Sequence, residues 1–307
     1  MNLFLIGNGF DSAHKLPTKY EDFQKYLIET YPKALENNPS FSISSTLMPD
    51  GEIVYDINEV VAFLMDIVSK AEEDGEKWSD VETSLGKLDF EEYFDDMSYL
   101  YNEDEEDFNF FHQAYDYEDV SSNFFSVTIM IKQLFAEWID TINIEAVDPI
   151  ISFKNTINPD EDYFINFNYT PVLEEIYDAK NVFHIHGEQS SEIIFGHGVF
   201  KENFENNYVG TEFNLANIHN SLRKNTDQVI EQWSEMFHSL KNIKSIYSYG
   251  FSFSQVDLPY IKEICKVIDT KNITWYLNDY NYETTGNVYI ERIKSCGFKG
   301  DFSIFST

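Results

Sequence analysis

The sequence predicts an α/β fold in which a largely parallel sheet is interrupted by a large helical insertion. The chain begins with an uncharged apolar run that stops at Gly7-Asn8-Gly9, as expected for a buried strand entering a tight turn. Helical periodicity then dominates the first half, while the second half alternates short apolar runs with helical segments. Because parallel strands need crossover connections, this alternation favours a parallel sheet flanked by helices.

The first half is predicted to be helical. Thr18 and Glu21 have the spacing of a capping box before the first helix. We expect a loop without periodicity over 39–51 and a helix that begins near Asn58 and ends near Gly75. The helices expected here cover 19–30, 58–75, 78–85 and 120–144.

The second half contains the remaining strands. They are expected at 163–167, 182–185, 193–195, 243–249, 273–277 and 302–305, with helices at 171–178, 215–240, 256–268 and 284–295. The first strand must join this sheet across an insertion of about 140 residues, far longer than an ordinary crossover. We therefore expect residues 1–18 and 160–307 to form the α/β core and residues 19–159 to form a mostly helical insertion.

Composition restricts the partners. The chain has 307 residues, is 43% hydrophobic and carries a net charge of −33, which disfavours nucleic acid as a ligand because phosphate binding needs clustered Lys and Arg. Cys265 and Cys296 are the two cysteines, so a four-cysteine zinc ribbon is excluded and we expect no metal. No apolar run reaches the roughly 18 residues of a membrane span, and we expect a cytoplasmic protein without a membrane partner.

Residues 89–119 form an acidic, aromatic-rich segment. It contains thirteen Asp and Glu residues and no Lys or Arg, interleaved with Phe and Tyr. This aromatic content is too high for a disordered acidic tail, so we expect helices with a solvated acidic face. Mimicry of nucleic-acid charge is the alternative for this segment.

Polar groups follow the carboxyl ends of several predicted strands, where ligands of open parallel sheets collect. Asp11 and His14 follow the first glycine turn, and Glu82 shares a predicted helix face with apolar residues, either at the edge of the core or in a pocket wall. The other strand-end groups are Asn168, Thr170, His186, His197, Gly250, Ser252 and Asp257. Polar groups converging from several strand ends predict one binding site.

Taken together, these motifs identify a family resemblance over nearly the whole chain. The chain resembles the bacteriophage abortive-infection AbiH family, which implies a bacterial anti-phage defence protein. The motifs that carry the resemblance are Leu3-Phe-Leu-Ile-Gly-Asn-Gly-Phe-Asp11, Trp78-Ser-Asp-Val-Glu82, Ile165-Asn-Phe-Asn-Tyr-Thr170, His184-Ile-His-Gly187, Ile194-Phe-Gly-His197 and Tyr249-Gly-Phe-Ser-Phe-Ser-Gln-Val-Asp257.

The order of the motifs also resembles, more distantly, the sirtuin-type NAD-binding domain of the Rossmann type. On that resemblance Gly7 and Gly9 match the pyrophosphate-loop glycines, with Asn8 between them, while Asn168 and His186 match the catalytic asparagine and histidine. Thr170 stands where sirtuins carry Asp, and the zinc ribbon of deacylating sirtuins is missing. What remains is similar to zinc-less sirtuin-like domains of defence systems, which degrade NAD. The resemblance implies an NAD glycohydrolase that takes NAD as its substrate.

Two other functions stay open from the residues. One is a nucleotide-binding sensor without catalysis that acts through protein partners. The other is a metal-dependent hydrolase in which His184, His186 and His197 hold the ion, because His184 and His186 share a face if the strand is extended through both. For partners we expect a small-molecule nucleotide, together with a homo-oligomer or a phage-derived trigger protein.

Overall fold

The computed structural model describes residues 1–307 except 73–77, 79, 100, 102–108 and 281. The chain divides into two compact units, and each is described by itself. The first unit comprises residues 1–19, 139–194 and 224–307, and the second comprises 20–138 and 195–223. These boundaries differ from the expected ones at three places. Lys19 and residues 139–159 belong to the α/β unit, and residues 195–223 belong to the helical unit.

The first unit is built on a parallel sheet of six strands in the order β5-β4-β1-β6-β7-β8. The strands are β1 (Leu3–Ile6), β4 (Tyr163–Asn166), β5 (Asn181–His184), β6 (Ser245–Tyr249), β7 (Thr274–Asn278) and β8 (Asp301–Phe305). Each neighbouring pair is parallel, with Leu3 opposite Tyr163 on one side and Ile246 on the other. Counted along this unit, the order is 3-2-1-4-5-6, the doubly wound arrangement of a Rossmann-like fold. The expected central position of the first strand is confirmed.

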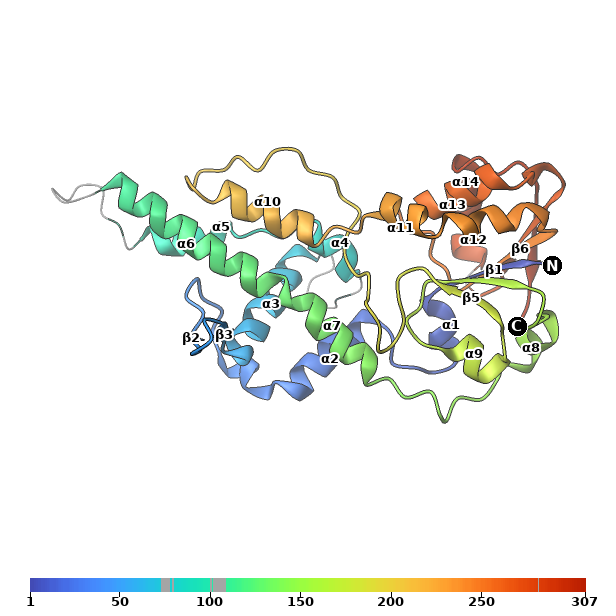
Figure 1. Cartoon of the computed structure of the whole chain (residues 1–307), viewed down its shortest axis with the longest axis horizontal. Coiled ribbons are helices and arrows are strands. Elements are labelled where there is room, and N and C mark those ends of the chain that lie inside the picture. Colours follow the sequence, from blue (N-terminus) through green and yellow to red (C-terminus); the bar gives the residue numbers. More distant parts are fainter. Residues whose placement is uncertain (73–77, 79, 100, 102–108, 281) are drawn as a thin grey trace. The chain divides into compact units, whose positions relative to one another are not determined.

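Helices cover both faces of this sheet (Figure 1). All four residues of β1 are buried, as a strand covered on both faces requires. Leu3 and Leu5 belong to the apolar cluster formed with the helices on one face, while Phe4 stacks on Phe164 and meets Phe153 edge-on at the other. The helices of this unit are α1 (Asn8–Ala13), α8 (Ile151–Thr156), α9 (Val172–Tyr177), α11 (Thr226–Gln232), α12 (Ser234–Ser239), α13 (Leu258–Val267) and α14 (Tyr282–Ser295).

The second unit is mostly helical. Its core includes Phe124, against which the rings of Phe63 and Phe94 both pack. Its elements are α2 (Tyr20–Thr30), β2 (Ser45–Leu47), β3 (Ile53–Tyr55), α3 (Ile57–Ala71), α4 (Val81–Leu85), α5 (Glu91–Ser98), α6 (Phe110–Thr128), most of α7 (Met130–Asp140) and α10 (Glu212–Ser221). The helices expected in the acidic 89–119 segment are present as α5 and the start of α6, and residues 100 and 102–108 lie outside the described part.

Several expected elements were wrong in detail. The run 193–195 is not a strand: Phe195 is buried because its ring stacks on Phe135 at 4.0 Å, which explains its apolar character without strand pairing. The helix expected over 120–144 breaks at Ile129, after the β-branched Val127 and Thr128, which lower helix propensity.

Two further segments also differ from the secondary structure expected for them. The segment 215–240 is covered by α10, α11 and α12 rather than by one helix. Asn225 accepts a hydrogen bond from the Gln228 amide and so caps the start of α11, which accounts for the break between α10 and α11. The loop expected over 39–51 contains β2, which pairs antiparallel with β3 as a hairpin.

Candidate functional site

The loops that follow β1 and β6 pack backbone against backbone. The Gly7 amide donates to the Tyr249 carbonyl at 3.0 Å, and the Gly9 amide donates to the Gly250 carbonyl at 2.9 Å. A Cβ on Gly9 would lie 2.6 Å from the Gly250 Cα, and Gly250 itself has a φ of +63°. The glycines are therefore required by this close approach, whether or not the loop also meets a phosphate.

A cavity of about 1040 Å³ opens beside these two loops. It lies at the carboxyl ends of β1, β6 and β7, and the first two are the strands between which the chain order of the sheet reverses. Its charged lining residues are Lys19 and Asp279. The lining as a whole is Gly9, Ser12, Ala13, Lys19, Ile150, Ser248, Tyr249, Gly250, Phe251, Ser252, Phe253, Leu277, Asn278, Asp279, Tyr280, Tyr289 and Thr307. The volume is at the upper end of the range of ligand sites.

Asn8 is the first residue of α1 and directly precedes the cavity-lining Gly9. Its side-chain amide donates to the Thr18 carbonyl at 2.8 Å, and its carbonyl oxygen accepts from the Thr18 hydroxyl at 2.6 Å. The two bonds join the start of α1 to the segment that precedes α2. Asn8 is thus used to close the loop that ends at the cavity-lining Lys19.

Asp11, in α1, is the centre of a buried polar network that also reaches Gly7, the residue after β1. Its carboxylate accepts from the Asn168 side-chain amide at 2.8 Å and from the Thr170 hydroxyl at 2.7 Å. The same amide of Asn168 donates to the Gly7 carbonyl at 3.1 Å. Burial raises the pKa of Asp11 to about 7, although both hydrogen bonds and the nearby His184 favour its charged form. Three predicted site residues are thus brought together.

His184 extends this network. Its Nδ1 donates to the Asn168 carbonyl at 2.9 Å, and its Nε2 lies 2.9 Å from a Glu174 carboxylate oxygen. Burial alone would lower the pKa of His184, but the hydrogen bond and charge of Glu174 raise it above its usual value. A chain of polar contacts therefore runs from Asp11 through Asn168 to His184 and Glu174.

His186 lies in a separate cluster. Its Nε2 is 3.1 Å from the Tyr260 hydroxyl and 3.9 Å from an Asp257 carboxylate oxygen, which lies 4.0 Å from Lys224 Nζ. Burial, with Lys224 nearby, lowers the pKa of His186 well below its usual value. Asn168 and His186, expected to act as a pair, thus have different partners, and neither is among the described residues that line the cavity.

The family comparison accounts for these motifs together. The model of the family described as "Bacteriophage abortive infection AbiH" matches residues 3–279. The chain belongs to the AbiH family. It therefore has an abortive-infection role in bacterial defence against phage. Neither the curated proteins nor the solved structures contain a match to the chain. The AbiH match covers five of the six strands of the sheet, from β1 to β7, together with the helical unit, and it ends before β8.

Two other predicted site residues of this AbiH chain lie in the helical unit. His197 Nε2 donates to the His219 carbonyl at 3.0 Å and its Nδ1 accepts from the Val199 amide at 3.1 Å, so both ring nitrogens are used and the imidazole is neutral. Burial lowers the pKa of His197 to about 4. Glu82 lies half-buried in the first turn of α4. These contacts give His197 a structural role in its own unit.

His14 has a structural role in the α/β unit. Its Nδ1 donates to the Phe10 carbonyl at 2.8 Å, and its Nε2 lies 2.6 Å from the Tyr177 hydroxyl. Burial lowers the pKa of His14. The imidazole therefore links the end of α1 to α9, and it is not among the described cavity-lining residues.

The histidine trio considered for a metal-dependent hydrolase does not form one group in the described structure. β5 ends at His184, so the extended backbone needed for His184 and His186 to share a face stops two residues early. His184 contacts Glu174 on α9, whereas His186 contacts Tyr260 on α13. His197 belongs to the other unit.

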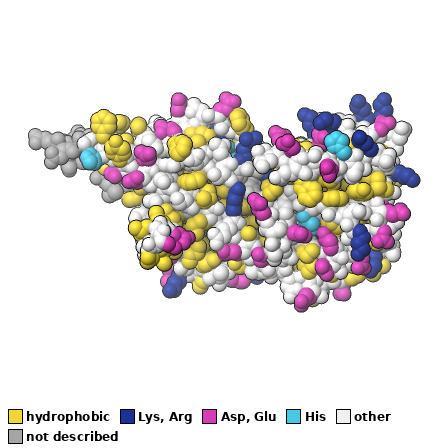
Figure 2. All heavy atoms as spheres, viewed as in Figure 1, with side chains coloured by type: hydrophobic (Ala, Val, Ile, Leu, Met, Phe, Trp, Pro, Cys, Tyr) yellow, Lys and Arg dark blue, Asp and Glu magenta, His cyan; other side chains and the backbone are white. Residues whose placement is uncertain are grey.

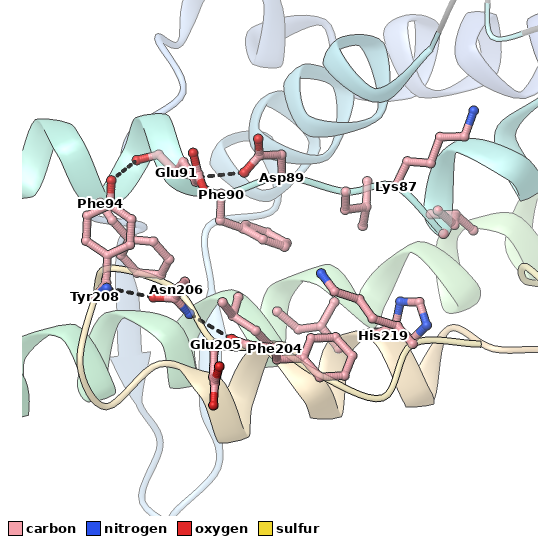
Figure 3. Close-up of a pocket in the computed structure, with 16 residues that line it drawn as sticks. Lys87, Asp89, Phe90, Glu91, Phe94, Phe204, Glu205, Asn206, Tyr208 and His219 are labelled. Carbon is pink, nitrogen blue, oxygen red and sulfur yellow. Dashed lines mark hydrogen bonds between the residues drawn. The ribbon is translucent and has the colours of Figure 1, made fainter. Parts of the chain in front are cut away.

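A second cavity, of about 330 Å³, lies within the helical unit (Figure 3). Phe94 and Tyr208 pack against each other in one part of its lining, with ring centroids 5.0 Å apart, and Phe204 packs against His219 in another, with ring centroids 5.3 Å apart. The Tyr208 amide donates to the Asn206 side chain at 2.7 Å, which fixes the loop that lines one side.

The structure also identifies cavity residues that the strand-end rule should have found. Asp279 and Tyr280 directly follow β7, the position at which the rule selected Asn168 and Ser252 after other strands. Lys19 carries no such signal, because it precedes a helix rather than following a strand.

No helix among the described residues is long and apolar enough to cross a membrane.

Proposed function

We propose that this AbiH protein is an abortive-infection effector that binds NAD in the cavity beside β1 and β6 and hydrolyses it to nicotinamide and ADP-ribose. The supporting observation is a cavity of about 1040 Å³ at the point where the strand order of the sheet reverses. In doubly wound sheets this crevice is where dinucleotides bind. The likeness of the motifs to sirtuin-type domains supplies the choice of NAD among nucleotides.

The cavity offers a cation for the pyrophosphate of NAD and a carboxylate for the ribose from which nicotinamide leaves. Lys19 is the lining cation that would neutralise the pyrophosphate, beside the backbone of Gly9 and Gly250. Loss of nicotinamide leaves positive charge on the ribose, which a carboxylate stabilises, and Asp279 is the carboxylate of the lining. The remaining requirement is to hold the ribose and admit one water molecule.

Asn168 and Asp11 would act as positioning residues in this proposal. Asn168 joins the Gly7 carbonyl to the Asp11 carboxylate, so it fixes the first loop relative to α1. Ser12 and Ala13, the residues after Asp11, line the cavity. The catalytic role expected for His186 stays a prediction, and its lowered pKa would make it a neutral imidazole.

The test is formation of nicotinamide from NAD by the purified full chain. We expect nicotinamide and ADP-ribose in equal amounts, and Asp279→Asn should lower kcat at least about tenfold with little change in KM, because the charge acts in the transition state. Asp148→Asn, an exposed acidic position, is the matched control. NAD binding without nicotinamide formation would favour the sensor function, and formation unaffected by Asp279→Asn would place the chemistry elsewhere.

A further inference from the structure

Glu174, His184 and Glu188 form a compact set of potential metal ligands at the end of β5. Among the described residues, this is the one group of three whose ligand atoms all lie within 4.8 Å of one another. His184 Nε2 is 2.9 Å from a Glu174 oxygen and 3.7 Å from a Glu188 oxygen. The distances are those of groups that a single ion can draw together.

The local backbone explains why the three side chains meet. Gly187, three residues after the end of β5, turns the chain with a φ of +85°, and a Cβ there would lie 2.0 Å from the Glu192 carbonyl oxygen. The Glu188 amide donates to the Ser191 hydroxyl at 2.9 Å, which holds Glu188 in this turn. Glu174 comes from the first turn of α9. Three separate elements thus present one ligand each.

The imidazole of His184 is oriented as metal-binding imidazoles are. Its Nδ1 donates to the Asn168 carbonyl, which leaves Nε2 directed at the two carboxylates. This arrangement, with one ring nitrogen fixed by a carbonyl and the other on the ion, is usual for metal-ligating histidines.

An independent observation concerns Glu174. Its Oε2 is buried and has no hydrogen-bond partner in the described part of the chain, whereas its Oε1 contacts His184. A buried carboxylate oxygen without a partner is costly, and a second carboxylate within 4.8 Å adds repulsion. A cation among the three groups would give the Glu174 oxygen a partner and would offset the repulsion between the two carboxylates.

We propose that Glu174, His184 and Glu188 bind one divalent transition-metal ion such as Zn²⁺. One imidazole and two carboxylates form a mixed nitrogen and oxygen set that suits Zn²⁺ better than Mg²⁺. The side chain of Glu188 is 50% exposed, so water completes the coordination from the solvent side. The ion would tie the turn after β5 to α9. The sequence predicted no metal on the basis of the two cysteines, and the only metal site that it left open used a different set of histidines. The proposed site therefore departs from that prediction.

The test is a Zn²⁺ titration of the full chain, freed of metal beforehand, in excess Mg²⁺ to occupy nonspecific acidic sites. We expect one Zn²⁺ per chain, a higher Tm with Zn²⁺, and affinity at least about tenfold weaker in Glu188→Gln, whose exposed position keeps the fold intact. Glu192→Gln, an exposed acid in the same turn, is the control that should match the unmodified chain. His184→Ala should abolish the binding.

Two outcomes would overturn the metal site. One is the absence of stoichiometric binding, which leaves only an ion pair between His184 and Glu174. The other is stoichiometric binding that Glu188→Gln and His184→Ala leave unchanged, which would put the ion elsewhere. Because the readout is binding of Zn²⁺ without NAD, failure of this proposal is independent of the proposed function.

Discussion

At the scale of single residues, Asp11 makes the stability of the protein depend on pH. The residue is 1% exposed, and burial raises the pKa of its carboxyl from 3.8 to about 7. Below about pH 4 the carboxyl is protonated in both the folded and the unfolded chain, so its contribution to the free energy of unfolding is fully present. Between about pH 4 and 7 the unfolded chain releases this proton and the folded chain keeps it, so the contribution is lost as pH rises through the folded pKa.

Asp11→Asn tests this pH dependence. The amide can accept from Asn168 and donate to the Thr170 hydroxyl, as the protonated carboxyl does, but it has no proton to lose. We expect the free energy of unfolding of the unmodified chain to fall relative to Asp11→Asn between pH 4 and 8, by on the order of 3–4 kcal/mol. Denaturant unfolding at several pH values measures it. A difference that is constant over this range would show that Asp11 has an ordinary pKa.

The sequence identified the members of this network but not their pairing. Asp11 and Asn168 were both selected because they follow strands, yet 157 residues separate them and no spacing rule joins them. The resemblance assigned the catalytic role to His186. Whether the side chains of His184 and His186 point in the same direction, however, depends on the residue at which β5 ends. Such a boundary is the least predictable property of a strand from sequence.

At the scale of elements, the contact between the β1 and β6 loops is the most constrained feature. Gly250 has a φ of +63°, and an added Cβ would lie 2.2 Å from the Phe10 amide nitrogen. Gly297 has a φ of +102° but no atom within 4 Å of an added Cβ. The two glycines share the backbone requirement and differ in the space around them.

Gly250→Ala should therefore be far more destabilising than Gly297→Ala. We expect about 1–2 kcal/mol for Gly297→Ala from the left-handed backbone alone, and at least about 3 kcal/mol more for Gly250→Ala because backbone atoms must move. The free energy of unfolding of the two variants gives the comparison, and failure of Gly250→Ala to fold agrees with it. Equal losses would mean that the two loops do not approach as closely as described.

Strands with a strong burial signal were predictable. β1 is apolar throughout and ends at glycine, and its central position followed from that pattern. The run 193–195 is also short and apolar, but for another reason. Phe195 lies in a loop and is buried because its ring packs against Phe135, so the run resembles a strand without being one. Short apolar runs therefore predict burial more reliably than they predict strands.

At the scale of the whole molecule, charge opposes the proposed ligand. The chain carries 54 acidic and 21 basic residues, and Figure 2 shows Asp and Glu side chains distributed over the visible face with Lys and Arg among them. A net charge of −33 repels an anion such as NAD at long range. Binding then depends on local groups, and Lys19 is the cation that lines the cavity.

The most direct measurement is calorimetric titration of NAD into the full chain and into two tryptophan variants of one loop. Ser252 is exposed and lines the cavity, whereas Gln255 is exposed and is not among its lining residues. We expect one NAD per chain, loss of affinity by at least about tenfold in Ser252→Trp because the indole occupies the cavity, and unchanged affinity in Gln255→Trp. Absence of NAD binding to the unmodified chain, or equal affinity in all three proteins, would contradict a nucleotide site between β1 and β6.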